Sequence, residues 1–239
     1  MRCRGLRGLF AVAVVAAGAV KTASADAISF ISQDRSVAAV AGVVFGGSHD
    51  LEQNTESAPD FNVFDAFVSA DASLPHVATA HAEATQFSEL SPFEISGHGA
   101  VAASALDEGV DGLDVVIADS ALLVTFFISE AVAYTAQASL FSEGTPGFGA
   151  VSAGFRLTGP GGDLVNFVFS GGASSILAAG VLQPGQYTLE AGGAFSALNA
   201  PHNVPSDFFG SFDFRLAVVP EPATAFLIGA GLLALRRRR

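Results

Sequence analysis

The densest group of acidic residues in the chain stands between two predicted strands. Gly109 and Gly112 interrupt it and would let the backbone wrap around an ion. Carboxylate oxygens on a flexible loop are the ligands that Ca²⁺ prefers. The spacing matches neither an EF-hand nor a nonapeptide repeat, so we expect no dedicated metal site and no cofactor. The candidate calcium ligands are Asp107, Glu108, Asp111 and Asp114.

Histidines suggest two other kinds of chemistry. Ser48-His49-Asp50 contains the residue types of a hydrolase triad, but neighbours in sequence cannot share one line of proton transfer. We expect this tripeptide in a glycine-rich turn. His81 and Glu83 share one face of a predicted strand and His76 takes the other. This spacing gives no three-ligand metal set.

A glycine pattern offers a third possibility. Gly97 to Ala102 matches a loose dinucleotide-binding fingerprint, and Asp119 follows 20 residues after Gly99, where a ribose ligand would stand. The intervening segment is too short for a crossover helix, because Asp107-Glu108-Gly109 interrupts it after about two turns. We therefore interpret Gly97 to Ala102 as a strand with a glycine bulge.

Catalytic carboxylates need not be close in sequence. Asp65, Glu94 and Asp119 could meet only in the fold, so an extracellular hydrolase stays open as an alternative, and a calcium-dependent adhesion module is another. The sequence contains no Gly-x-Ser-x-Gly nucleophile elbow. The sequence also shows no nucleophile beside a plausible base, and no recognisable pair of catalytic carboxylates. We therefore expect a non-enzymatic protein.

The C-terminus carries three zones in fixed order. The triplet Pro220-Glu221-Pro222 comes first, an uncharged apolar run from Ala223 to Leu235 follows, and the chain ends with Arg236, Arg237, Arg238 and Arg239. This order resembles the PEP-CTERM sorting signal of bacteria that make exopolysaccharide. The resemblance covers about the last 20 residues. It implies that the triplet is recognised by an exosortase, a membrane transpeptidase-like enzyme, and that exopolysaccharide is a candidate partner.

The tail can also be considered as a membrane segment. Its thirteen apolar residues make a helix about 20 Å long, shorter than the ~30 Å hydrocarbon core, so the arginines must snorkel for it to span. Positive charge resists translocation, which predicts a cytoplasmic C-terminus with the rest of the chain outside. We expect a precursor anchored in the inner membrane, then processing and delivery to the cell surface or extracellular matrix. An unprocessed tail anchor is the alternative.

The N-terminus predicts export independently. Three arginines precede an apolar run from Leu9 to Val20, and Ala23-Ser24-Ala25 then supplies the small-x-small pattern of signal-peptide cleavage. We expect residues 1–25 to be removed by signal peptidase, with Ala23 and Ala25 as the recognised positions. The single cysteine, Cys3, lies in this segment, so the mature chain has no disulfide and no thiolate ligand.

Charge distinguishes the body of the chain from its two ends. Between Asp26 and Val219 there are 22 acidic residues against three arginines, Arg35, Arg156 and Arg215. Phosphate binding depends on lysine and arginine, so nucleic acid is excluded as a partner. This charge is typical of a solvated, exported protein.

The composition of residues 26–219 favours one secreted all-β domain, an antiparallel β-sandwich or jelly roll followed by a short C-terminal transmembrane helix in residues 220–239. Glu130 to Phe141 alternates apolar and polar residues, which predicts a half-buried strand. Ten further strands are predicted at Ala27 to Ser32, Phe61 to Ala70, Val77 to Phe87, Phe93 to Leu106, Val115 to Ser129, Val151 to Thr158, Leu164 to Ser170, Ser175 to Val181, Gln186 to Leu198 and Ser211 to Val219.

Two connections between these strands carry specific predictions. Gly42 to Asp60 shows no clear alternation, so we expect a long loop or an irregular edge there. Pro184-Gly185 suits the central positions of a type II turn, since proline fixes φ near −65° and glycine accepts positive φ. We expect this turn to close a hairpin. The whole pattern predicts an exported surface or matrix protein with a structural or binding role.

Overall fold

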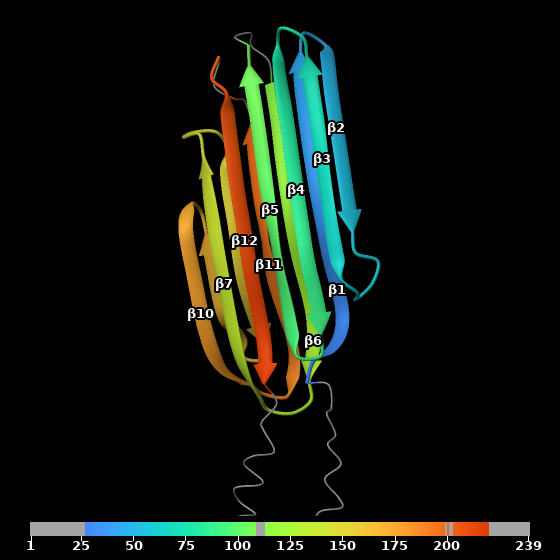
Figure 1. Cartoon of the computed structure of the whole chain (residues 1–239), viewed down its shortest axis with the longest axis vertical. Coiled ribbons are helices and arrows are strands. Elements are labelled where there is room, and N and C mark those ends of the chain that lie inside the picture. The colour runs from blue at the N-terminus through green and yellow to red at the C-terminus, as the bar shows by residue number, and fades with distance from the viewer. Residues whose placement is uncertain (1–26, 109–112, 199, 201–202, 220–239) are drawn as a thin grey trace, which may run out of the picture.

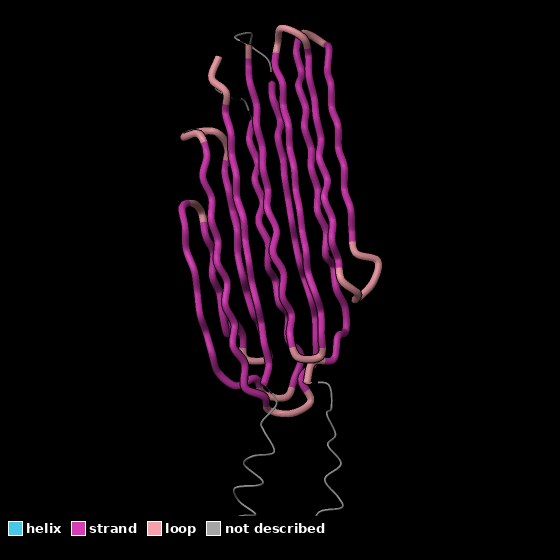
Figure 2. Tube along the Cα trace, in the orientation of Figure 1, coloured by secondary structure: helices cyan, strands magenta, loops and turns pink. Residues whose placement is uncertain are grey.

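Antiparallel strands form two six-stranded sheets that pack face to face (Figure 1). The structure is a computed structural model that describes residues 27–108, 113–198, 200 and 203–219. The predictions for residues 1–25 and 220–239 lie outside these ranges. Almost all of the described chain is strand, as the tube in Figure 2 shows. The all-β prediction is therefore confirmed, and the two layers are those of a β-sandwich.

The two sheets have the following strands, in spatial order. Sheet A consists of β2 (Ser48–Ser57), β1 (Ser29–Phe45), β6 (Leu113–Ile128), β11 (Gly185–Leu198), β8 (Ala150–Gly159) and β9 (Gly162–Phe169). Sheet B consists of β10 (Gly172–Leu182), β7 (Val132–Gly144), β12 (Ser206–Val219), β5 (Glu94–Asp107), β4 (Ala78–Ser91) and β3 (Phe64–Leu74). The sandwich is elongated because most strands run nearly its full length (Figure 1).

Period-two alternation builds the core. In β7, residues from Val132 to Phe141 alternate between buried and exposed, as the sequence predicts. Large side chains fill one part of the space between the sheets, including Phe126, Phe155 and Leu216. The other part is filled largely by alanine, on β1, β3, β4 and β5. The alanine-rich segments are thus strands, and their small side chains allow the two sheets to approach closely.

Of the two alternatives predicted for Gly42 to Asp60, the long loop is wrong and the edge is correct, although this edge strand pairs regularly. β1 continues to Phe45, a turn follows at Gly46-Gly47, and β2 pairs with β1 from Ser48 to Ser57. Ser48-His49-Asp50 therefore begins a strand rather than lying in a turn. Most side chains of β2 are exposed on both faces, because it is an edge strand, and this removes the alternation that would have identified it.

The predicted hairpin at Pro184-Gly185 is also wrong. β10 belongs to sheet B and β11 to sheet A, so the connection between them crosses from one layer to the other. Gly185 does take a positive φ, 154°. Within the described ranges no helix is long and apolar enough to cross a membrane.

Side chains of β2 close one side of the sandwich. Two backbone N–H groups of β3 donate to carboxylates of β2, Asp71 to Glu52 at 3.1 Å and Ser73 to Asp50 at 2.8 Å. The Asn54 amide of β2 donates to the carbonyl of Ser69 at 2.6 Å. Alternate side chains of the edge strand β2 thus form hydrogen bonds with the backbone of the edge strand β3. These bonds protect this side of the sandwich from pairing with another chain.

Both ends of the described chain lie at the same pole of the sandwich (Figure 1). The β4–β5 turn holds them: the N–H of Ile28 donates to the carbonyl of Pro92 at 2.9 Å, and that of Val218 donates to Phe93 at 2.8 Å. Because Pro92 and Phe93 are adjacent, Ile28 and Val218 lie close together at this pole.

Candidate functional site

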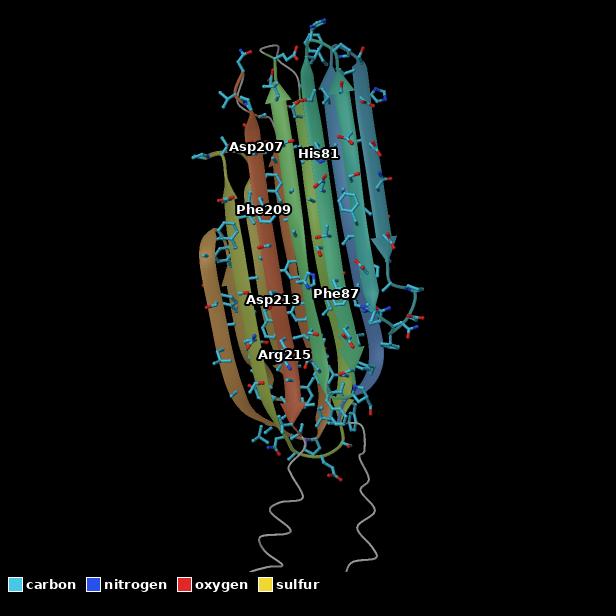
Figure 3. All side chains as sticks on the ribbon, in the orientation of Figure 1. His81, Phe87, Asp207, Phe209, Asp213 and Arg215 are labelled. Carbon is cyan, nitrogen blue, oxygen red and sulfur yellow. The ribbon has the colours of Figure 1, made fainter. Side chains whose placement is uncertain are left out.

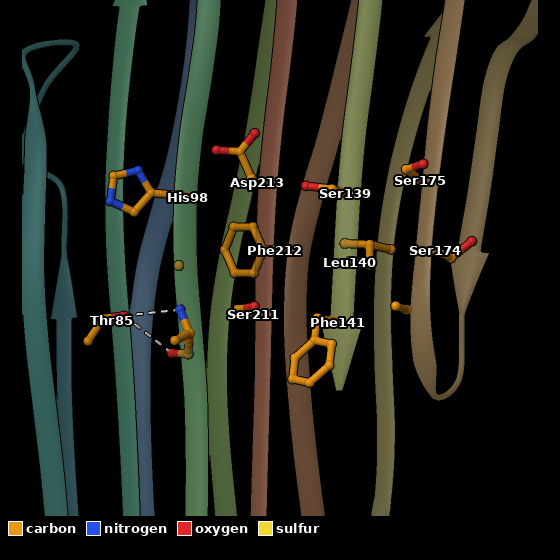
Figure 4. A pocket seen from close by; sticks show the side chains of 13 residues that line it. Thr85, His98, Ser139, Leu140, Phe141, Ser174, Ser175, Ser211, Phe212 and Asp213 are labelled. Atoms are coloured by element: carbon orange, nitrogen blue, oxygen red, sulfur yellow. Dashed lines mark hydrogen bonds between the residues drawn. The ribbon is translucent and has the colours of Figure 1, made fainter. Parts of the chain in front are cut away.

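A groove of about 700 Å³ crosses the outer face of sheet B (Figure 4). It spans five of the six strands, from β4 to the edge strand β10. Its floor is made of small residues, among them Ala100 and Ser211, and an open groove of this kind can accept an extended ligand. The lining residues are Thr85, His98, Gly99, Ala100, Ser139, Leu140, Phe141, Ala173, Ser174, Ser175, Ser211, Phe212 and Asp213.

Strand register aligns polar side chains across this groove. His98 on β5 is opposite Asp213 on β12, Asp213 is opposite Ser139 on β7, and Ser139 is opposite Ser175 on β10. In Figure 4 these four side chains lie at nearly the same level on successive strands. They offer an imidazole, a carboxylate and two hydroxyls, which together can donate and accept hydrogen bonds.

Aromatic rings stand near this polar row. His98 stacks on Phe87 of β4 with 5.2 Å between ring centroids and an interplanar angle of 20°. On the adjacent strands, Phe141 and Phe209 lie 6.3 Å apart with tilted rings. Figure 3 shows Phe87, Phe209 and Asp213 on the same face of the sheet. The groove therefore combines apolar ring surfaces with hydrogen-bonding groups, the usual composition of a small-ligand site.

Thr85 fixes the groove at β4. Its hydroxyl accepts from the N–H of Ala100 at 3.0 Å and lies 3.5 Å from the carbonyl of the same residue, as the dashed lines in Figure 4 mark. Farther toward the pole that holds the chain ends, Arg215 pairs with Glu94 at 2.7 Å. The positive charge of Arg215, next to the groove, is thus neutralised by Glu94.

The described residues predicted as calcium ligands do not all share one environment. Asp107 and Asp114 are buried, and an oxygen of Asp114 accepts from the N–H of Ala200 at 3.4 Å. Glu108 is exposed and lies 3.9 Å from His76, whereas Asp111 lies outside the described residues. In the part of the chain that is described, no group of three metal-ligating side chains is arranged to hold an ion. Calcium binding stays a prediction.

The proposed hydrolytic carboxylates do not converge. Asp119 is half-buried on the outer face of sheet A, where burial raises its pKa, whereas Asp65 and Glu94 lie on sheet B. Asp65 is opposite Phe87 and Glu94 is opposite Ser91. β3 and β5 are two strand spacings apart, and Glu94 lies four residues along β5 from the position level with Asp65. The distance between Asp65 and Glu94 is therefore about 16 Å. These three residues cannot act on one bond.

The dinucleotide interpretation of Gly97 to Ala102 is excluded, because this segment lies within β5 and the next described element is the strand β6, not a crossover helix. The glycine bulge is also wrong: β5 pairs with β4 and with β12 without a register shift. Gly97 and Gly99 instead face the core opposite Phe214 and Phe212, whose rings occupy the space that a Cβ would take.

His81 lies between two carboxylates on the outer face of sheet B. Its Nδ1 is 2.7 Å from Asp71 and its Nε2 is 3.0 Å from Glu83. Burial alone would lower the pKa of His81, but hydrogen bonds to both carboxylates and their charges raise it overall. The predicted sharing of a face by His81 and Glu83 is confirmed, and both ring nitrogens are occupied.

We expect the His81→Gln substitution to make stability less dependent on pH. Because the folded-state pKa is raised, protonated His81 stabilises the fold fully below the unfolded value of about 6.5, and this contribution disappears as pH rises through the folded pKa. His81 is about a third exposed, so the difference between wild type and variant should stay below about 1 kcal/mol at pH 5.5. Thermal melts between pH 5.5 and 9 measure it. The exposed His49→Gln variant is the control, and an equal pH dependence in both variants would contradict the assignment.

The sequence does not identify the groove residues. His98 is notable only as part of the glycine pattern and as a histidine that, like His202, could join a metal site through the fold, and no pattern distinguishes Asp213 or Ser139. The alternation of their strands did indicate outward side chains. Only the register between strands distant in sequence, β5 with β12 and β12 with β7, places the three together.

Comparison with known proteins assigns the end of the chain. Residues 218–239 match the family model of the PEP-CTERM protein-sorting motif, which contains the triplet, the apolar run and the terminal arginines. The resemblance noted from these residues is thereby confirmed. No curated protein matches the chain.

Proposed function

With the PEP-CTERM sorting motif marking an exported, exosortase-targeted chain destined for the cell surface, we propose that the sandwich is a non-enzymatic surface or matrix protein that binds exopolysaccharide. The observation that carries this proposal is the groove on sheet B, which is open and crosses five strands. The ring of Phe141 lines it beside the polar row from His98 to Ser175, so a sugar of an extended polymer could find both an apolar surface and hydrogen-bonding partners there.

The charge of the body restricts the polymer class. Between Asp26 and Val219 there are 22 acidic residues and only three arginines, so the body is strongly negative. Arg215 pairs with Glu94, and Arg156 pairs with Asp163 at 3.0 Å. Polyanionic polysaccharides would be repelled by this surface. The proposal is therefore a neutral polymer.

A binding experiment tests the groove. We expect the exported protein to be retarded in native gels that contain a soluble neutral glucan, and not in gels that contain alginate. Phe141→Ser should abolish the retardation, because it removes a ring at the groove. Phe127→Ser is the matched control, since Phe127 is similarly exposed but lies on sheet A. Equal retardation of both variants and wild type would place binding elsewhere, and no retardation by any neutral glucan would contradict the proposal.

The layout of the fold supports the sorting part of the proposal. Ile28 and Val218 lie close together at one pole, both bonded to the β4–β5 turn. A signal peptide and a C-terminal membrane segment in one precursor must reach the same membrane surface, and this pole can present both to it. The groove, on the side of the sandwich, would remain accessible above the membrane.

We expect the processed protein to begin at Asp26 and to end near Pro220. Intact-mass analysis of the surface fraction measures both ends at once. The membrane fraction of the same cells, which should contain the longer precursor, is the control. A surface species that still carries Arg236 to Arg239 would show a plain tail anchor instead of exosortase processing.

A further inference from the structure

The two sides of the sandwich are built differently. On one side, side chains of β2 bond to the backbone of β3, and both strands carry acidic residues. On the other side lie β9 and β10, each with a strand neighbour on one edge only among the described strands. β10 consists of 11 residues and contains no charged residue and no proline. It lacks the features that usually prevent an edge strand from pairing.

Apolar side chains are exposed along this second side. On β10, Leu177 is 74% exposed and Val181 is 55% exposed. On the neighbouring edge strand β9, Val168 is 76% exposed. The single charged residue of β9, Asp163, is already bonded to Arg156 at 3.0 Å. This side is therefore apolar and nearly free of net charge.

The charge distribution indicates what covers this side. The body carries 22 acidic residues against three arginines, so two copies repel one another over most of their surface. The exposed face of β10 has no charge to repel a second copy. A free edge of 11 residues also offers a continuous row of backbone donors and acceptors to another strand.

We propose that a second copy of this chain pairs with this one, β10 against β10, about a two-fold axis. Such pairing is antiparallel, as every pairing within sheet B already is. It uses the same surface on both copies, so pairing through β10 closes at a dimer. The two copies of sheet B become one continuous sheet, and the apolar side chains of β10 pack across the axis.

Leu177 is the middle residue of β10, so in a symmetric pairing along the whole strand it lies directly opposite its own counterpart. Ala173, Ser174 and Ser175 of the same strand line the groove on sheet B. The dimer would therefore bring two grooves to one shared edge. The inference stands on the edge strand alone and does not depend on what the groove binds.

Site-directed cross-linking tests the pairing in the full exported chain. A Cys3→Ser background keeps the introduced thiol single. We expect Leu177→Cys to form a disulfide-linked dimer under mild oxidation, because directly opposed residues bring their Cβ atoms to about 5 Å. Thr55→Cys, on the protected edge strand β2, is exposed as well and should stay monomeric. Stronger cross-linking at position 55 than at position 177 would overturn the proposal.

A charge variant provides an independent measurement. Leu177→Lys places two like charges at the axis and should weaken dimerisation about tenfold or more. Thr55→Lys is the matched control and should leave it unchanged. Sedimentation of the detergent-extracted chain reports the mass, and thermal melting confirms that the variants fold. A monomeric wild type, a dimer that Leu177→Lys leaves intact, or a β10 edge occupied only by another protein would each refute pairing between copies.

Discussion

Replacing Arg35 with alanine is expected to lower the free energy of unfolding by about 3 to 5 kcal/mol. Arg35 lies on β1 in the inward-facing row that continues with Val37 and Ala39, and only 1% of its surface is exposed. It is the largest fully buried side chain among the described residues. The N–H donors of an arginine in a core must be hydrogen-bonded to fixed partners. In this fold those hydrogen bonds connect several segments of the chain.

The guanidinium of Arg35 bonds to three separate parts of the fold. Nη1 donates to the carbonyl and hydroxyl of Ser88 on β4, at 3.3 and 3.2 Å. Nη2 donates to the carbonyls of Asp60 and Asn62, at 2.5 and 2.8 Å, in the connection from β2 to β3. Nε donates to Gln33 at 2.9 Å. Burial lowers the pKa of Arg35 and the charge of Asp60 partly offsets this, yet a guanidinium stays protonated.

Removal of the Arg35 side chain leaves these acceptors without their donor and opens a cavity, and both effects destabilise the native state. Thermal unfolding should shift by roughly 10 °C for a domain of this size. Arg35→Lys should fall between wild type and alanine, because one ammonium cannot reach all partners. Arg215→Ala is the control: Arg215 is exposed and paired with Glu94, so its loss should cost less than about 1 kcal/mol. Equal losses at positions 35 and 215 would disprove the structural role of Arg35.

How far the sequence predicts this fold depends on where each strand lies. β7 and β12 are half-buried, so their alternation predicted them. β2 could be predicted only as a loop or an irregular edge, because an edge strand with both faces exposed has no apolar face to identify it. Arg35 was counted only as charge, since its neighbours alternate ordinarily and its partners on β4 and after β2 come from 25 to 53 residues away.

The groove could not be predicted for a related reason. Alternation indicates which side chains of a strand point outward, but it does not say which strand lies beside it or in what register. His98 and Asp213 are opposite one another because β5 and β12 pair with one particular alignment. A shift by one residue would turn Asp213 into the core. The sorting motif is different, because its residues are contiguous and their order is itself the signal.

The second large effect is expected at Gly99. A Cβ at this position would lie 2.5 Å from the carbonyl oxygen of Thr85 and 2.5 Å from Cζ of Phe212. The ring can shift, but the Thr85 carbonyl belongs to the β4 backbone and cannot move without disturbing the sheet. We therefore expect Gly99→Ala to destabilise the fold by about 2 to 3 kcal/mol, although alanine is usually tolerated in strands.

Gly154 provides the matched control for this prediction. It is also a strand glycine, but a Cβ there would meet only the carbonyl of Phe167, at an ordinary 3.4 Å. Gly154→Ala should be neutral or slightly stabilising, since it removes freedom from the unfolded chain. If the ring of Phe212 causes part of the cost at Gly99, then Phe212→Leu should destabilise less in the Gly99→Ala background than in wild type. Thermal melts of the four proteins in this cycle measure that coupling. Additive losses would assign the whole cost to the Thr85 carbonyl, and equal stability of Gly99→Ala and Gly154→Ala would show that β5 carries no such constraint.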